Sequence, residues 1–232
     1  MKTNRVTGIV LLSVVGLSMQ PGMALAYTRK HSAPTDLMNA SDRGDLGTIR
    51  RLIKAGTQIN AFDARGMSAL KYAVQGHQRT DELMYRTVNL LLDAGADVNL
   101  ADKDSGQTPL MEAAFFHEWK LCSLLVHRGA DVNKRDNSGQ TAIFFGSNDV
   151  QTARTLIKLG ANVRMTDDMG ETALHQAVFR HNTEVVTALV GAGADPSIEA
   201  KTHETPLAIA ERDHLKEILR ILRRAVKSPK QD

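Results

Sequence analysis

The most chemically reactive side chains in this sequence are eight histidines and a single cysteine. Such residues can act as metal ligands, nucleophiles or acid–base groups, but only in suitable arrangements. The histidines are scattered, and no pair has a convincing metal-ligand spacing on one face of an expected element. The patterns H-E-x-x-H, C-x-x-C and G-x-S-x-G do not occur, and neither does a phosphate-binding glycine loop. We therefore expect no catalytic site, no metal site, no cofactor and no enzymatic activity.

Cys122 and two acidic groups have simpler explanations than chemistry. Cys122 lies in a stripe of apolar residues and has no second cysteine to pair with, so we expect a small buried hydrophobic residue. A reactive thiol is the alternative. Asp167 and Asp168 are adjacent, and Asp102 and Asp104 flank a lysine. Both groups fall in expected hairpin turns, where we expect them to be solvated, because a calcium loop would need more oxygen ligands at alternating positions.

A recurring string of residues indicates the structural units that carry these side chains. Its clearest copy is Gly129-Ala130-Asp131-Val132-Asn133, and related strings begin at residues 56, 95, 160 and 193. A second glycine follows ten or eleven residues later, at positions 66, 106, 139 and 170, and His203 stands where the next is expected. The glycines at 106, 139 and 170 are 33 and 31 residues apart. A period of this length indicates stacked structural repeats.

The residue types within each repeat predict two helices followed by a loop. A threonine before an apolar run can cap the N–H groups of a helix, and proline fits its first turn. Alanines allow helices to approach closely, glycine ends a helix where φ is positive, and a short carboxylate can bond backbone N–H groups of the loop. These residues are Thr108, Thr141, Thr172 and Thr205; Pro109 and Pro206; Ala113, Ala114 and Ala177; Gly95, Gly129, Gly160 and Gly193; and Asp102, Asp136 and Asp168.

From about residue 36 to residue 225 the chain resembles the ankyrin-repeat family, which has this spacing and a T-P-L-H-x-A-like start. The resemblance implies an all-α solenoid of about six helix-turn-helix repeats with hairpin loops. His175 stands at the T-x-L-H position, where the family's histidine ties adjacent repeats by hydrogen bonds. Other repeats have Met111, Phe144 and Ala208 there, so we expect no metal cluster along the stack. We place the solenoid at residues 36–226 and a disordered tail at 227–232.

Two repeats depart from the regular length. Ser68 to Gly95 spans 27 positions, against 21 from Thr108 to Gly129, so about six residues are inserted within 77–87. The insertion is either a binding loop or, alternatively, a lengthened helix or neutral loop. Thr141 to residue 160 spans only 19 positions, and the missing two fall near residues 146–148. We expect the first helix of this fourth repeat to be shortened.

The N-terminus has the features of an export signal. Lys2 and Arg5 precede an apolar run over residues 8–19, and Ala24-Leu25-Ala26 matches a cleavage site. A lone amphipathic helix is the alternative. We expect a cleavable signal peptide at 1–26, a flexible leader at 27–35, a periplasmic or secreted location and no stable membrane anchor. Cleavage lowers Lys+Arg from 29 to 27 against 26 Asp+Glu, which does not favour nucleic-acid binding.

The resemblance implies that a protein partner is held by the hairpin tips and by the exposed ends of the first helices. Aromatic and arginine side chains there are candidate anchors. Phe115 and Phe116 have an alternative role, which is to fill the gap beside the shortened fourth repeat. The candidate partner-binding residues are Phe115, Phe116, Trp119, Phe179, Arg180 and Arg212 at the helix ends, and Lys103, Lys134, Arg135 and Met165 at the tips. The basic and apolar tips suit an acidic partner surface.

The sequence therefore favours a monomeric, exported protein–protein interaction module of a bacterial, periplasmic type. The resemblance implies three possible roles. The first is an immunity-type protein that binds and inhibits a toxin or enzyme. The second is an accessory factor that supports a periplasmic enzyme, such as one of oxidative-stress defence. The third is a secreted effector directed at a host.

Overall fold

The computed structural model describes residues 36–76 and 80–227. The predicted signal peptide, the leader, residues 77–79 of the insertion and residues 228–232 of the tail lie outside the described residues. The described part of the chain forms six consecutive helix pairs joined by hairpin loops, which confirms the predicted all-α solenoid. None of its helices is both long and apolar enough to cross a membrane.

Each pair has a first helix and a second helix. The pairs are residues 36–43 with α2 (Leu46–Lys54); α3 (Ala69–Gln75) with α4 (Asp81–Asp93); α5 (Pro109–Phe115) with α6 (Trp119–His127); α7 (Ala142–Phe145) and the 3-10 turn η1 (Gly146–Asn148) with α8 (Val150–Lys158); α9 (Ala173–Phe179) with α10 (Thr183–Gly191); and α11 (Pro206–Arg212) with α12 (Lys216–Lys227).

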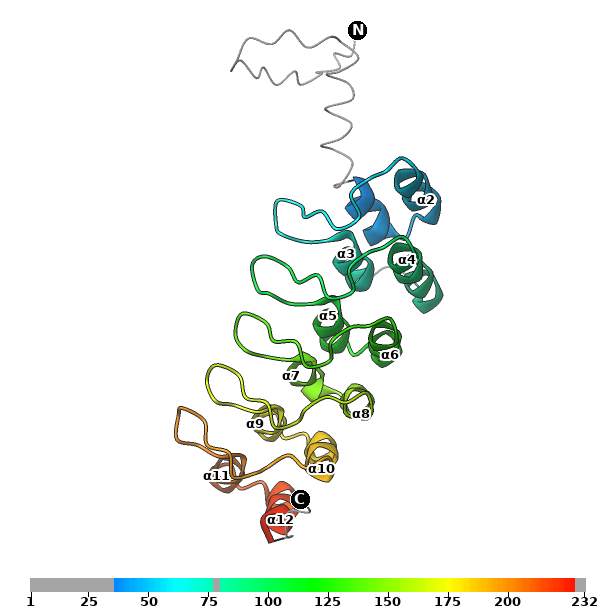
Figure 1. Cartoon of the computed structure of the whole chain (residues 1–232). Helices are drawn as coiled ribbons and strands as arrows, with labels where there is room; N and C mark the ends of the chain where they lie inside the picture. The colour runs from blue at the N-terminus through cyan, green and yellow to red at the C-terminus, as the bar shows by residue number, and fades with distance from the viewer. Residues whose placement is uncertain (1–35, 77–79, 228–232) are drawn as a thin grey trace, which may run out of the picture. The chain divides into compact units, whose positions relative to one another are not determined.

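The first helices form one row and the second helices another. Figure 1 shows the first-helix row between the hairpin loops and the second-helix row. Each first helix from α3 to α9 contacts the next first helix, and α6, α8, α10 and α12 contact one another in sequence. The alanines predicted for close approach, Ala113, Ala114 and Ala177, are fully buried between first helices. Burial of small and branched aliphatic side chains between neighbours therefore supplies the core.

The two irregular repeats differ from their neighbours in helix length. α4 has 13 residues where α2, α6, α8 and α10 have nine, and the hydroxyl of Thr80 accepts the N–H of Leu83 at its start. The described part of the insertion is thus a lengthened helix. α7 has four residues where α3, α5, α9 and α11 have seven, which confirms the predicted shortening.

Shortening also changes how α7 begins. Thr108 and Thr205 accept the N–H of the third helical residue at 3.3 and 3.1 Å, as predicted for caps. The prediction was wrong for Thr141, whose buried hydroxyl makes no hydrogen bond. Instead the N–H of Phe144 donates to the main-chain carbonyl of Thr141 at 3.0 Å, a tighter turn that leaves the hydroxyl without this donor.

An aspartate closes the hairpin loop in four of the repeats. Asp63, Asp136 and Asp167 each accept the N–H groups two and four residues later, at 2.8 to 2.9 Å. Asp102 accepts those two and three residues later, at 3.0 and 2.6 Å. The prediction of Asp168 for this role was wrong by one residue. The prediction of solvated turns was also wrong for Asp102 and Asp167, because their carboxylates are buried while they bond the loop backbone.

The asparagine of the recurring string links a repeat to the next one at three junctions, and Arg164 replaces it at the fourth, where it donates to the carbonyl of Gly193 at 3.0 Å. The side-chain amide of Asn99 donates to the carbonyl of Gly129 at 3.0 Å, and its oxygen accepts the N–H of Asp131 at 2.8 Å. Asn60 and Asn133 make the same pair of bonds to their following repeats. The string therefore ends one helix and also fastens the neighbouring loop.

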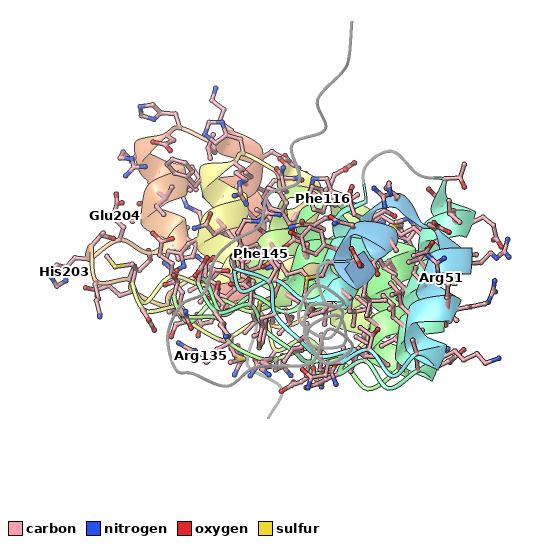
Figure 2. The ribbon with its side chains drawn as sticks, turned by 90° about the horizontal axis from the view of Figure 1, so that it is seen from above. Arg51, Phe116, Arg135, Phe145, His203 and Glu204 are labelled. Atoms are coloured by element: carbon pink, nitrogen blue, oxygen red, sulfur yellow. The ribbon has the colours of Figure 1, made fainter. Side chains whose placement is uncertain are left out.

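The second glycine of each repeat has a positive φ and lies against the next hairpin. At Gly106 an added Cβ would lie 2.9 Å from the backbone nitrogen of Asn137, and at Gly139 it would lie 3.0 Å from that of Asp168. His203 has the same left-handed backbone, with φ +61°. It belongs to the last repeat, and Figure 2 shows it at the outer edge of the loops, on the opposite side from Arg51 of α2. No further hairpin of the described chain follows it, so a side chain is accommodated there.

We expect Gly139→Ala to destabilise the protein more than Gly129→Ala. Both glycines have left-handed backbones, with φ of +78° and +94°, which costs an alanine about 1–2 kcal/mol. Only Gly139 also has neighbouring atoms in the way of a Cβ, since nothing lies within 4 Å at Gly129. Overpacking of this kind adds about 1–3 kcal/mol. Urea unfolding followed by circular dichroism measures both changes, and equal losses would contradict the close hairpin stacking.

Candidate functional site

The predicted residues at the first-helix ends occupy equivalent positions in three repeats. Phe115, Phe179 and Arg212 are the last residues of α5, α9 and α11. The two phenylalanines are 59% and 67% exposed, unlike the apolar residues that precede them on the same helices. Large exposed apolar side chains of this kind are typical of interaction sites when they gather on one surface. The first-helix row therefore carries the strongest apolar candidates for binding.

Histidines turn the chain immediately after these helix ends. His117, His181 and His214 have φ values of +61°, +56° and +56°, and Gly44 has the same conformation in the first repeat. After α5, the N–H of His117 donates to the carbonyl of Ala114 at 3.2 Å. The next residue donates to the carbonyl of Ala113 at 2.9 Å, which completes a Schellman motif. The sequence interpretation missed this role, although an alignment with Gly44 would have indicated it.

The adjacent phenylalanines have different environments. Phe115 is exposed, whereas Phe116 is half-buried and its ring lies edge-on to that of Phe115, with centroids 5.3 Å apart. This arrangement favours a binding role for Phe115 and a packing role for Phe116. An edge-to-face contact also limits the freedom of the exposed ring.

A depression of about 270 Å³ lies beside the shortened α7. Phe115 and His117 of the third repeat line it, together with Phe144 and Phe145 of the fourth and Gln176 and Arg180 of the fifth. The gap left by the shortened repeat is therefore not filled by Phe115, which stands at its edge. Three repeats contribute to this one feature of the first-helix row.

Trp119 lies elsewhere. It is 38% exposed, and it lines a separate groove of about 500 Å³ with residues of α6 and α8, in the second-helix row. The ammonium of Lys120 lies 5.5 Å from the centre of its ring system. Trp119 and Phe115, both candidate partner-binding residues in the sequence, therefore lie in different helix rows and do not form one apolar patch.

The predicted basic residues at the hairpin tips contact neighbouring loops. The ammonium of Lys103 lies 4.7 Å from the centre of the Phe62 ring. Lys134 donates to the carbonyl of Asn99 at 2.8 Å. Arg135 donates to the carbonyl of Thr166 at 2.7 Å and to Asp168 at 3.3 Å. These contacts bridge adjacent hairpins. Met165 is half-buried, whereas Met169 in the same loop is 53% exposed. The tips therefore offer a partner less free positive charge than their composition predicts.

The two arginines predicted at the ends of first helices, Arg180 and Arg212, differ in their ionic partners. Arg212 pairs with Asp213 at 2.8 Å and with Glu204, and its hydrogen bond lowers the pKa of the Asp213 carboxyl. Arg180 donates to the buried hydroxyl of Ser147 at 3.0 Å. No described carboxylate lies within ion-pair distance of Arg180. Its charge is therefore the less compensated of the two on this row.

A buried ionic cluster joins the second and third repeats. Lys71 forms ion pairs with Asp102 and, at 3.2 Å, with Glu112, and all three residues are less than 9% exposed. Gln75 donates to Glu112 at 2.8 Å. Burial would raise the pKa of Asp102, but hydrogen bonds from Lys71 and Ser105 outweigh this effect and lower it to about 2. The cluster is internal, so we assign it to stability.

Lys71 stands where His175 stands in its own repeat, directly after the Ala-Leu pair of the helix start. His175 accepts the N–H of Thr172 at 3.0 Å and reaches the carbonyl of Glu204 in the next repeat at 3.3 Å. Burial lowers the pKa of His175, which favours the neutral ring. Its structural role matches the expectation. Lys71 is thus a further substitute for this histidine, beside Met111, Phe144 and Ala208, and its role was not predicted.

The remaining reactive groups that the structure describes have structural surroundings. Cys122 is buried in the core, and burial raises the pKa of its thiol to about 12, as expected of a packing residue. Within residues 36–76 and 80–227, no three histidine, cysteine or acidic side chains come together in a way that could hold a metal ion.

Comparisons of the sequence and of the structure with known proteins agree with the repeat fold described above. A family model described as "Ankyrin repeats (3 copies)" matches residues 37–136, 81–167 and 142–231. A putative ankyrin repeat-containing protein of Treponema pallidum is 33% identical over 150 residues, which are 64% of this chain and 48% of the relative. The chain thus spans about half the length of that relative, and smaller shares of several other curated proteins that it matches.

Two solved structures resemble the chain over most of its length. An ankyrin repeat domain from Acinetobacter baumannii has a TM-score of 0.74 and 29% identity, and the match covers 82% of this chain and 97% of the other. The second is in the complex of a predatory endopeptidase from Bdellovibrio bacteriovorus with an immunity protein. Its TM-score is 0.69 and its identity 23%, with the same two coverages.

Proposed function

The chain belongs to the ankyrin-repeat family, and we propose that it binds another protein through its first-helix row, with Phe115 and Phe179 as apolar anchors. The observation that carries this proposal is the exposure of two aromatic rings at equivalent helix ends, 59% and 67%, on helices whose other apolar side chains are largely buried. Exposed aromatic rings supply a large share of the energy of a typical interface.

The partner that we propose is a toxin or enzyme of the periplasm, which the chain inhibits as an immunity-type protein. Two observations support this finer assignment. The sequence of residues 1–26 has the pattern of an export signal. One solved structure of this fold is in a complex of an endopeptidase with an immunity protein, which supports the proposal by analogy. The roles of accessory factor and host-directed effector are alternatives, and the experiment below separates the accessory role from inhibition.

The test is capture from a periplasmic extract of the bacterium that encodes the chain. Residues 27–232 are immobilised as bait, and the protein retained is identified by mass spectrometry. Two control baits place a carboxylate on an equally exposed apolar residue: Phe179→Asp on the first-helix row and Val226→Asp on α12, where the valine is 54% exposed. We expect capture by the wild-type and Val226→Asp baits, and loss of capture with Phe179→Asp.

The activity of the captured protein decides the role. If the partner is an enzyme or toxin, added chain should inhibit it in a one-to-one titration. A rise in activity would replace inhibition with the accessory role. Equal capture by both aspartate variants would contradict the proposed surface itself.

A further inference from the structure

The depression beside α7 exists because the fourth repeat is two residues shorter than its neighbours. α7 ends after four residues and continues as the 3-10 turn η1, so the helix end that would occupy this space is missing. Phe115 lies at the end of α5, and Arg180 directly follows α9. Both residues therefore border a space that the end of a full-length helix would fill. This feature arises from an irregularity of this chain and not from the regular repeat.

Three phenylalanines form the apolar part of the depression's lining, and His117, Gln140, Asn148, Gln176 and Arg180 form its polar part. Phe144 forms part of the lining and is only 3% exposed, Phe145 is half-buried, and Phe115 presents an exposed ring at the edge. Its volume, about 270 Å³, lies below the range of roughly 300–1,000 Å³ typical of small-molecule sites. The space therefore suits one inserted side chain better than a free metabolite. The phenylalanines of the lining can stack on an aromatic occupant or pack edge-to-face against it.

The polar end of the depression carries a positive charge that is held in place. Arg180 donates one N–H to the hydroxyl of Ser147 at 3.0 Å, and Ser147 in turn donates to the carbonyl of Phe144 at 2.7 Å. Ser147 belongs to η1, so the shortened segment itself anchors the guanidinium. The remaining N–H groups of Arg180 have no carboxylate partner among the described residues. Arg212, by contrast, is neutralised by Glu204 and Asp213.

We propose that this depression binds an aromatic side chain of the partner protein that has a carboxylate next to it, with the ring between Phe115 and Phe145 and the carboxylate on Arg180. The inference rests on the proposed function and narrows the chemistry of its partner. An aromatic ring can pack against the phenylalanines of the lining, and a carboxylate can pair with the guanidinium of Arg180 and accept two parallel N–H bonds. The partner is thus a protein that presents an aromatic residue beside an acidic one.

Two small molecules test this chemistry on the purified protein. N-acetylphenylalanine carries a ring and a carboxylate, and N-acetylphenylalaninamide carries the ring without the charge. Both are titrated at millimolar concentration into residues 27–232 labelled with nitrogen-15, and backbone amide shifts are followed by NMR. We expect shifts at Phe115, Phe145 and Arg180, with the carboxylate compound binding about tenfold more tightly, as for a hydrogen bond to a charged group.

Matched variants test whether Arg180 binds the carboxylate and whether the depression holds the ring. Arg180→Gln should abolish the difference between the two compounds, and Arg212→Gln, at the neutralised arginine of α11, should leave it unchanged. Asn148→Trp, which adds a large side chain at an exposed residue of the lining, should block both compounds without lowering the melting temperature. Equal binding of the two compounds, or shifts confined to other surfaces, would overturn the proposal. So would self-association of the chain that protects the depression, because the occupant would then be a second copy.

The two proposals fail separately. In one outcome, a protein is captured through the first-helix row while neither compound shifts the amides of the depression. The chemistry proposed for the depression is then wrong, but the first-helix row is still the binding surface. If the compounds bind as expected but Phe179→Asp leaves capture unchanged, then the depression is a real site and the proposed function is wrong.

Discussion

Replacing Lys71 by methionine is expected to lower the free energy of unfolding by about 3–5 kcal/mol, the typical cost of breaking a buried ion pair from one side. Methionine preserves much of the apolar stem but removes the ammonium. Asp102 and Glu112 would then remain buried without their cation, in a site where all three residues are less than 9% exposed. The loss is measured by urea unfolding at neutral pH. Lys54→Met, at an exposed lysine of α2, is the matched control and should change stability by less than about 0.5 kcal/mol.

The pH dependence follows from the pKa of Asp102. That pKa is lowered in the folded protein to about 2 from an ordinary value of 3.8, so the unfolded state binds the proton more tightly. The carboxylate therefore contributes stability above pH 3.8, about 2 kcal/mol by linkage, and this contribution is lost as the pH falls through 2. Lys71→Met removes a main cause of the lowered pKa. The difference in stability between wild type and variant should therefore shrink between about pH 4 and pH 2.

Asp102→Asn checks that both effects belong to one cluster. Its cost and that of Lys71→Met should not add in the double variant, because the two residues share one ion pair. Strict additivity, or a stability difference that does not change with pH, would show that the cluster contributes little to the junction of the second and third repeats.

The second large effect is expected on binding. Once the partner has been captured, Phe115→Ala and Phe179→Ala should each weaken its affinity by about 30-fold or more, the loss of about 2 kcal/mol that defines an interface hot spot. Both rings are exposed in the free chain, so truncation leaves no cavity and stability should change little. Isothermal titration calorimetry measures the affinity, and thermal unfolding measures the stability of the same samples.

Phe116→Ala provides the contrast. Phe116 is half-buried against Phe115 and the helix end, so its truncation should lower stability and reduce affinity only indirectly. If Phe116→Ala weakens binding more than Phe115→Ala at unchanged stability, then the assignment of the two neighbouring rings is reversed.

The fold could be predicted because its signals are local and repeated. Glycine after the second helices, proline in the first turn and alanine between helices each have a physical reason, they recur in several repeats, and the structure has those residues in those roles. The shortening of α7 was also predictable, since a deletion within a repeat must remove residues from a helix or a loop.

Some of the errors came from interactions that join one repeat to the next. The burial of Asp102 and the ion pairs of Lys71 depend on where the neighbouring hairpin lies. The spacing of residues within one repeat does not show how closely the hairpin of the neighbouring repeat packs against it. The role of Asp167 rather than Asp168 is instead set within its own loop, three residues before the second glycine, as at Asp63 and Asp136. The missing bond of Thr141 likewise follows from the tight turn of a shortened helix. A lysine at the histidine position was visible in the sequence, and comparison across repeats would have identified it.

The candidate site was predictable in part for the same reason. The ends of the first helices are a fixed place in the repeat, so Phe115 and Phe179 could be expected to lie on one row of the fold. The sequence alone could not separate exposed Phe115 from half-buried Phe116, or place Trp119 in the second-helix row. It also could not show that Arg212 has carboxylate partners while Arg180 has none among the described residues, because that depends on side-chain geometry: Arg212 pairs with Glu204 and Asp213 of its own repeat, whereas Arg180 contacts Ser147 of the preceding repeat.

Site-specific photo-crosslinking tests the central claim, which is that the first-helix row is the surface that holds a protein partner. A photoreactive phenylalanine derivative replaces Phe179 in one sample and Val226 in the other, because both side chains are exposed and lie in different helix rows. The samples are irradiated in periplasmic extract and the adducts are identified by mass spectrometry. We predict one defined protein adduct from position 179 and none from position 226. An adduct only from position 226, or the same adduct from both, would contradict the account.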